Sequence, residues 1–168
     1  QPGNAIPIDR TRIDAFLRSL PFALTAAQAR ALDEILEDMA QSRPMSRLLQ
    51  GDVGSGKTVV AAAAALAASA AGYQVAVLAP TEILAEQHAQ SFRSLYAGLP
   101  DDARPVVALL TGSTPERTRQ EIERGLRDAS IHLLIGTHAI LEDWVQFRRL
   151  GLAIIDEQHR FGVLQRAA

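Results

Sequence analysis

Cysteine is absent from this sequence of 168 residues, and its absence excludes both a disulfide framework and a metal site built on thiolates. The four histidines are scattered, without carboxylates at metal-ligand spacing, and give no metal-site signature. A strong charge of either sign is also lacking. The formal net charge of −2 gives no overall attraction to nucleic acid or to an anionic membrane. Local contacts to a phosphate backbone, through main-chain amides and a few side chains, remain open.

Long apolar runs and a signal sequence are lacking as well. The longest run of small apolar residues, at 59–71, is too short to span a bilayer. The N-terminus lacks the basic-then-apolar pattern of a signal peptide. We therefore expect a cytoplasmic protein with no membrane partner. The sequence begins at Gln1 without methionine and stops at Ala168 without a polar tail, which favours a piece of a longer chain over a small processed protein.

The composition is that of a folded globular chain, with 48% hydrophobic and 21% charged residues, and the length suits about one domain. Residues 1–24 contain three prolines and little sustained periodicity. We expect this segment to be a lead-in or linker, with at most a short helix at 12–20. From Thr25 the pattern changes, and residues 25–168 are expected to form the domain.

Apolar runs and helical patterns alternate along residues 25–168. Thr25 and Gln28 have the spacing of a capping box before a helix with one apolar stripe. Gly72 is expected to end a second helix, and Thr114 to cap a later one. This alternation predicts an α/β fold in which a parallel sheet is sandwiched between helices. The expected strands are 46–50, 74–80, 105–111, 131–137 and 152–156, and the expected helices are 25–40, 57–71, 81–98, 114–127 and a short piece at 138–144.

The sequence GDVGSGKT at 51–58 matches the pattern G-x-x-x-x-G-K-[ST] between an expected strand and an expected helix. The glycines let the backbone curl so that successive N–H groups point at phosphate oxygens, beside a helix N-terminus that favours an anion. Lys57 would add a charge for the β- and γ-phosphates, and the Thr58 hydroxyl would be a ligand of Mg²⁺. The expected nucleotide-binding residues of this loop are Gly51, Gly54, Ser55, Gly56, Lys57 and Thr58.

A second half of such a site is the apolar strand that ends in Asp156 and Glu157. Asp156 would hold Mg²⁺ directly or through water, and Glu157 would orient and deprotonate the attacking water. Carboxylates at a strand end are common for other reasons, but together with the loop they indicate a site for ATP and Mg²⁺. The expected catalytic residues are Lys57, Asp156 and Glu157.

The residues DEQH at 156–159 resemble the DExH box of superfamily 2 helicases and translocases, and the resemblance covers nearly the whole chain. Its combination of motifs is most similar to the RecG-type DNA helicases, which remodel stalled replication forks, with the transcription-repair coupling translocases as close relatives. The matching segments are LPFALTAAQ at 20–28 (Q-motif), GDVGSGKT (motif I), APTEILAEQH at 79–88 (motif Ia), LLTGS at 109–113 and IGTHAI at 135–140 (nucleic-acid contacts), and IIDEQHRFGVLQR at 154–166 (motif II).

The resemblance implies the first RecA-like motor domain, with a P-loop, of an ATP-dependent DNA helicase that acts on forked or branched DNA in repair and recombination. Gln28 would read the adenine edge with its amide, although a capping box alone would also explain this residue. Phe22 would stack near the base or belong to the core. Gln158 and His159 would couple the γ-phosphate to a second motor domain.

Three corners between a strand and a helix would contact a single DNA strand. In the family such corners offer backbone amides and a hydroxyl to phosphates, and here they would share the carboxyl edge of one sheet. Helix capping is the alternative for Thr81, and a plain surface position is the alternative for His138. DNA is favoured over RNA only by the family resemblance. The expected contacts are Pro80, Thr81, Glu82, Thr111, Gly112, Gly136, Thr137 and His138.

The resemblance also implies a second RecA-like domain that carries the arginine fingers of the ATPase cycle and is not part of these residues. We therefore expect weak nucleotide binding and little DNA-stimulated hydrolysis from this part alone. An alternative of a different class is a nucleotide-dependent switch without translocation, which the three corners argue against.

Arg148 and Arg149, beside Trp144 and Phe147, are expected in a solvated loop rather than in a nucleic-acid patch.

Overall fold

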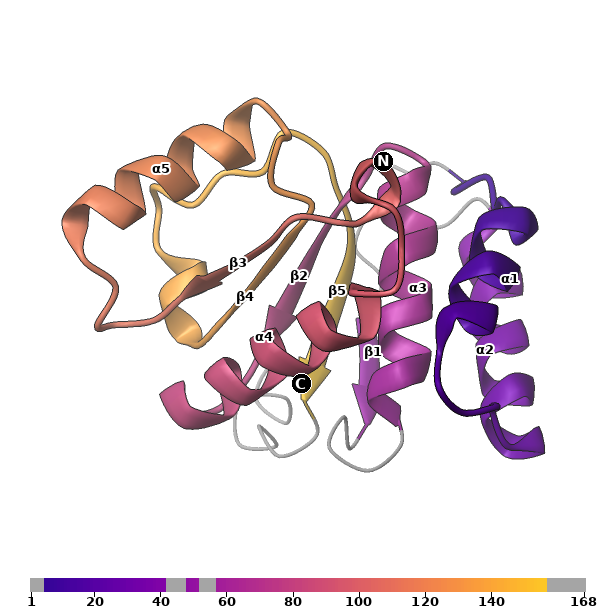
Figure 1. The fold of residues 1–168 in the computed structure, drawn as a ribbon. Helices are drawn as coiled ribbons and strands as arrows, with labels where there is room; N and C mark the ends of the chain where they lie inside the picture. Colours follow the sequence, from indigo (N-terminus) through magenta and orange to yellow (C-terminus); the bar gives the residue numbers. More distant parts are fainter. Residues whose placement is uncertain (1–4, 42–47, 52–56, 157–168) are drawn as a thin grey trace, which may run out of the picture.

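The alternating pattern produces a parallel sheet with helices on both faces (Figure 1). The computed structural model describes residues 5–41, 48–51 and 57–156. No helix in this described part is both long and apolar enough to span a membrane. The helices are α1 (Arg10–Ser19), α2 (Ala26–Met39), α3 (Thr58–Ala70), α4 (Glu82–Tyr96) and α5 (Glu116–Arg127), with 3-10 turns η2 (Asp101–Ala103) and η3 (His138–Leu141). The strands are β1 (Leu48–Gly51), β2 (Gln74–Leu78), β3 (Val107–Leu110), β4 (Leu133–Gly136) and β5 (Leu150–Asp156).

All five strands are parallel and lie in the order β1-β5-β2-β4-β3. All of β4 is buried, and β2 and β5 are buried along most of their length. A sheet covered on both faces needs apolar residues on both, which explains why the sequence shows continuous apolar runs instead of alternation. The predicted α/β fold and its five strands are confirmed, and each strand end lies within two residues of its expected position.

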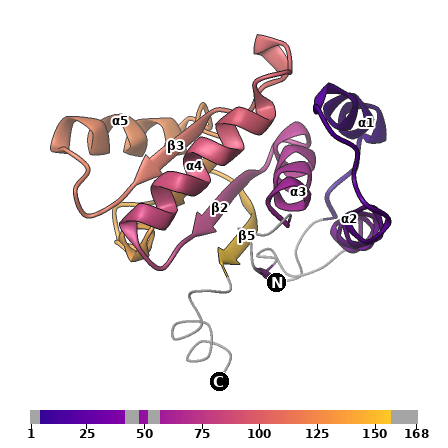
Figure 2. The same ribbon diagram turned by 60° about the horizontal axis from the view of Figure 1, so that its bottom comes forward.

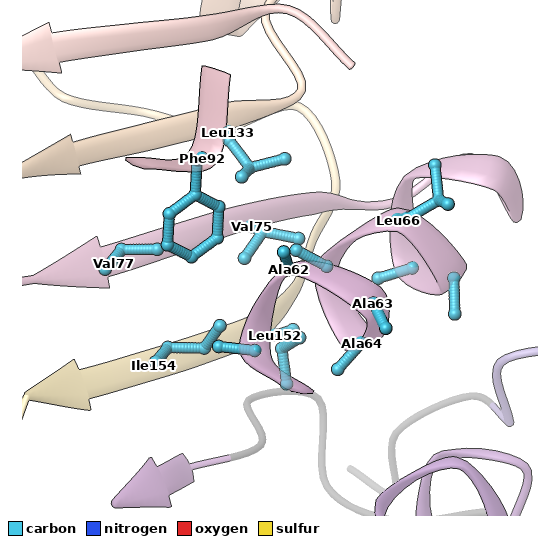
Figure 3. Packing of buried hydrophobic residues seen from close by; sticks show 14 of the residues in the cluster. Ala62, Ala63, Ala64, Leu66, Val75, Val77, Phe92, Leu133, Leu152 and Ile154 are labelled. Carbon is cyan, nitrogen blue, oxygen red and sulfur yellow. The ribbon is translucent and has the colours of Figure 1, made fainter. Parts of the chain in front are cut away.

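Helix α3 lies at the centre of the main core, with the sheet on one side and α1, α2 and α4 around it (Figure 3). Residues 59–68 are all buried, and most of them are alanine. Short methyl side chains let the neighbouring helices and strands approach closely without voids. Tyr96 of α4 donates a buried hydrogen bond of 2.7 Å from its hydroxyl to the carbonyl of Ala62, so the polar tip of this core residue is satisfied.

The segment expected as a lead-in contributes to this core. Helix α1 begins at Asp9, whose carboxylate accepts hydrogen bonds from two amides of the first turn. Its residues Ile13 and Phe16 are completely buried, and the Phe16 ring lies 5.6 Å from the ring of Tyr96. The short helix expected at 12–20 is therefore present and packs on α3. A domain boundary at residue 25 stays a prediction.

The opposite face of the sheet is covered by α5 and η3. A second apolar cluster there joins Leu110 and Leu134 of the strands to Ile122 and Leu126 of α5 and Ile140 of η3. Helix α5 has one apolar stripe and a charged outer side, so it covers the sheet with one face only. The sheet is thus sandwiched between helices, as predicted.

The amino edge of the sheet is fixed by residues that precede β2 and β5. Gly72 ends α3 with a φ of 93°, in the left-handed region that favours glycine, as the sequence predicted. The Arg149 guanidinium lies over the Tyr73 ring, 4.1 Å from its centroid, while the buried amide oxygen of Gln74 accepts a hydrogen bond from the Arg149 backbone. Arg148 is exposed, as expected for a solvated loop, whereas Arg149 is held in place.

The last residue of β4, Gly136, has no room for a side chain. A Cβ built there would overlap the carbonyl oxygen of Leu110 in the neighbouring strand. We expect Gly136→Ala to lower the free energy of unfolding by about 2–3 kcal/mol, because strand pairing or the chain beyond it must shift. The matched control is Gly112→Ala, where no atom lies within 4 Å of the added methyl group. Urea unfolding of both variants checks this, and equal midpoints would contradict it.

Candidate nucleotide and nucleic-acid site

The five parallel strands end at one edge of the sheet, which Figure 2 brings forward. The register pairs Gly51 at the end of β1 with Asp156 at the end of β5. It likewise pairs Leu78 and Leu110, the last residues of β2 and β3, with Gly136. Open parallel sheets bind their ligands at this carboxyl edge. The structure therefore brings the described part of the expected nucleotide site and the three expected corners to a common edge.

The expected phosphate-binding loop is the segment between β1 and α3. Gly51 is the last residue of the strand, Thr58 is the first of the helix, and exposed Lys57 occupies the N-cap position. Among the described residues no side chain caps α3, and its first turn has no acidic residue. An uncapped helix N-terminus leaves amides and the positive end of the helix dipole for an anion. The expectations for Gly54, Ser55 and Gly56 concern residues outside the described part.

Asp156 is completely buried at the end of β5. The Nε2 atom of His88, on α4, lies 2.7 Å from its Oδ2 atom. His88 belongs to the segment at 79–88 that resembles motif Ia, and the sequence predicts no role for it. The available signal was its place in the buried stripe of α4, since a polar residue among apolar ones implies a partner.

An open groove of about 510 Å³ lies beside the start of α3. Gln28 lines it and also makes the predicted capping box. The side-chain Oε1 of Gln28 accepts from the Thr25 backbone amide at 2.9 Å, and the backbone amide of Gln28 donates to Thr25 Oγ1. Phe22 is 47% exposed, which excludes the core alternative for this ring. The position suits a nucleotide base next to the phosphate loop. The groove is lined by Phe22, Gln28, Thr58, Val59, Gln90, Ser91, Ser94 and Leu95.

In each of the three corners the threonine hydroxyl accepts a local hydrogen bond. Thr81 caps α4 by accepting from the Leu84 amide at 3.2 Å, and buried Thr137 accepts from the Ala139 amide at 3.4 Å. Buried Thr111 accepts from the amide of Ser113 at 3.2 Å. The contact of Thr81 is the helix cap that was the alternative for this residue. Contact with nucleic acid stays a prediction for these corners, and Thr81, Gly112 and His138 are their exposed members.

The start of α5 differs from the expectation. Thr114 was expected to cap this helix, but its hydroxyl accepts instead from the amide of Thr111 at 2.9 Å, and no side chain caps α5. A threonine hydroxyl can accept a hydrogen bond from the turn before it or from the helix after it. Here it accepts from the turn that follows β3.

Glu82 links the corner after β2, to which it belongs, with the corner after β3. Its Oε2 atom accepts from the backbone amide of Ser113, across 3.2 Å. Hydrogen bonds from the side chains of Ser113 and Thr111 lower the pKa of Glu82 below its ordinary value. A carboxylate repels phosphates. This geometry therefore suits a residue that holds the corner after β3 in place better than it suits a residue that contacts nucleic acid.

Part of the predicted site lies beyond the described residues. Glu157, Gln158 and His159 all follow the last described residue of β5. Within the described ranges no three histidine, aspartate or glutamate side chains gather into a metal site. This finding is compatible with Mg²⁺ carried by a nucleotide, because such an ion needs only one or two protein carboxylates.

The parallel sheet, the loop between β1 and α3 and the acid at the tip of β5 define a nucleotide-binding α/β domain. Residues 25–168 match the family model "DEAD/DEAH box helicase", and the chain belongs to this family. The predicted RecA-like, P-loop fold and the resemblance to DExH-box helicases are thereby confirmed.

The chain is similar to ATP-dependent DNA helicase RecG over nearly its whole length. It is 50% identical over 161 residues to the protein of Aquifex aeolicus, covering 96% of this chain and 20% of that protein. It is 54% identical over 164 residues to the protein of Streptococcus pneumoniae, covering 98% and 24%. A solved structure of RecG bound to a three-way DNA junction is 48% identical, with a TM-score of 0.83, covering 95% of this chain and 21% of that one. The chain thus spans about a fifth to a quarter of these relatives.

The hydrogen bonds around Glu82 predict a titration behaviour. Ser113→Ala should raise the pKa of Glu82 toward the ordinary value of 4.5, because it removes the largest stabiliser of the ionised form. A pKa lowered by folding adds stability above the unfolded pKa, and this stability is lost as pH falls through the folded value. The stability difference between wild type and variant should therefore vanish in acid. NMR titration checks the pKa, with Ser94→Ala as control, and an unchanged value in Ser113→Ala would contradict the role of this contact.

Proposed function

We propose that this domain is the ATP-driven motor domain of a RecG-like DNA helicase that remodels forked or branched DNA in repair and recombination. The observation that carries the proposal is the pairing of Gly51 with Asp156, since it sets the start of the phosphate loop beside the buried acid. Relatives about half identical are named ATP-dependent DNA helicases, and one solved relative is bound to a three-way DNA junction. Because the chain spans only part of these proteins, the activity is proposed for the full-length protein.

The described residues at this edge fit a nucleotide with Mg²⁺. Thr58 offers a hydroxyl and Asp156 a carboxylate, and Mg²⁺ prefers such hard oxygen donors. When bound, Mg²⁺ would neutralise charge on the β- and γ-phosphates. Lys57 would hold the same phosphates, the amides at the start of α3 would receive them, and Glu157 would orient the attacking water and accept its proton. Phe22 and Gln28 would take the adenine in the groove.

A single DNA strand would run along the three corners, across the tips of β2, β4 and β3. The local hydrogen bonds of the threonine hydroxyls fix the shape of the corners, so that backbone amides and the exposed residues would meet the phosphates. Glu82 would orient the corner at Thr111, which follows β3. This arrangement favours a translocating motor over a nucleotide switch, because a switch needs no such track.

A second RecA-like domain of the same full-length chain would complete the ATPase site, with Gln158 and His159 in the coupling between the two. A transcription-repair coupling translocase is the second candidate within the superfamily, and the identities with RecG favour the first. Action on chromosomal DNA in a bacterium would place the protein in the cytoplasm.

The test of this proposal is ATP hydrolysis by the full-length protein with and without forked DNA. DNA should stimulate hydrolysis, and Lys57→Ala or Asp156→Asn should each lower kcat by about 100-fold or more, because each removes charge stabilisation from the phosphates. Exposed Arg148, near the amino edge, offers the control variant Arg148→Ala. A rate that does not respond to DNA would favour the nucleotide switch.

The isolated residues 1–168 should hydrolyse ATP at least about 1000-fold more slowly than the full-length protein with DNA, because the arginine fingers are supplied by the second domain. Steady-state hydrolysis assays of both proteins check this. Rapid turnover by residues 1–168 that disappears in Lys57→Ala would contradict the need for that domain.

The adenine role of Gln28 can be separated from helix capping. Gln28→Ala should raise the KM for ATP and weaken the preference for ATP over GTP, because the amide matches the adenine edge. Thr25→Ala removes the other half of the capping box, at a cost of about 1 kcal/mol in stability, and leaves the amide in place. Equal effects of the two variants on the KM for ATP would show that Gln28 only caps α2.

A further inference from the structure

The contact between His88 and Asp156 joins two residues that are 68 positions apart in the chain. The His88 side chain is 6% exposed and the Asp156 side chain 0% exposed, and the Nε2 and Oδ2 atoms are 2.7 Å apart. A buried carboxylate is costly unless it is paired and hydrogen-bonded. A carboxylate that binds a metal ion is ionised and only accepts hydrogen bonds, so in the metal-binding form the ring would donate to it from Nε2. This bond fixes one carboxylate oxygen and with it the rotation of the group.

Helix α4 holds the His88 ring firmly. Its buried stripe consists of Ala85, His88, Ala89, Phe92 and Tyr96, packed against the sheet and α3. Close packing limits the rotamers that a buried side chain can adopt, so the buried His88 ring restrains its partner better than a solvent-exposed side chain would. Asp156 is thus anchored by the backbone of β5 and by a hydrogen bond from α4.

We propose that His88 is a positioning residue of the ATPase site, which orients the carboxylate of Asp156 for Mg²⁺ bound with the nucleotide. The inference rests on the proposed function of Asp156. Partners that orient metal-binding groups by hydrogen bonds typically change metal affinity by 10–100-fold when they are removed. The helix that carries His88 also begins at Thr81, seven residues earlier and about 10 Å along the axis. One rigid element thus carries the anchor of the acid and an expected DNA contact.

The experiment measures the binding of a fluorescent ADP analogue to the full-length protein as Mg²⁺ is added, without DNA. His88→Leu keeps much of the volume and removes the donor. His88→Gln places an amide donor near the position of Nε2, whereas the shorter His88→Asn reaches only the position of Nδ1. His132→Leu is the matched control, because His132 bonds the Val106 amide near the amino edge, away from the site.

The Mg²⁺ concentration at half-saturation should rise about tenfold or more in His88→Leu and His88→Asn. It should stay near the wild-type value in His88→Gln and in His132→Leu. If His88→Leu does not fold, the Mg²⁺ concentrations at half-saturation of His88→Asn and His88→Gln still test the inference. Thermal unfolding without nucleotide and Mg²⁺ reports the structural cost of each variant.

An unchanged Mg²⁺ requirement in the Leu and Asn variants, with only a lower melting temperature, would overturn the inference and leave His88 as a core residue. Asp156→Asn separates this result from a failure of the proposed function. If Asp156→Asn raises the Mg²⁺ requirement and the His88 variants do not, only the inference fails. If Asp156→Asn leaves it unchanged as well, the assignment of Asp156 to the metal is wrong.

Discussion

Helix α3 packs against the sheet on one side and against α1, α2 and α4 on the others, and the rest of the domain is arranged around it. Only small side chains allow a helix to be buried along residues 59–68 while its neighbours remain close. The same helix begins at the phosphate loop, so the core fixes the position of the helix N-terminus. A nucleotide that binds there would meet amides whose positions are set by the packing of α3.

The parallel arrangement of the strands accounts for the position of the rest of the site. Residues far apart in the chain, such as Gly51 and Asp156, become neighbours because their strands pair side by side and end at the same edge. The three corners follow from the same constraint. Hydrogen bonds then fix the details, with His88 on Asp156 and Glu82 on Ser113. Both side chains come from α4. Their contacts connect this helix to the end of β5 and to the turn after β3.

Much of the fold could be predicted from the sequence, because apolar runs of strand length alternate with helical stripes and the loop motif has a fixed spacing. The inclusion of α1 in the core was harder to see, since Ile13 and Phe16 are the only buried residues of a helix rich in polar ones. The place of His88 in the apolar stripe of α4 indicates a buried partner, but the identity of that partner depends on how α4 packs relative to β5. Thr114 shows the limit of capping rules. Its hydroxyl could accept from the first turn of α5 or from the Thr111 amide, and it accepts from the Thr111 amide. Glu82, for which nucleic-acid contact stays a prediction, accepts a hydrogen bond from the turn after β3, and no sequence pattern indicates this contact.

In the function that we propose, one edge of the sheet serves both the nucleotide and the DNA strand. The most direct measurement is a structure of the full-length protein with Mg²⁺, a non-hydrolysable ATP analogue and forked DNA. The account predicts the phosphates at the N-terminus of α3, with Mg²⁺ about 2.1 Å from the Thr58 hydroxyl and held by Asp156 directly or through water. It also predicts a DNA strand along the corners at Thr81, Thr111 and Thr137. A nucleotide bound elsewhere, or DNA on the amino edge beside Arg149, would contradict it.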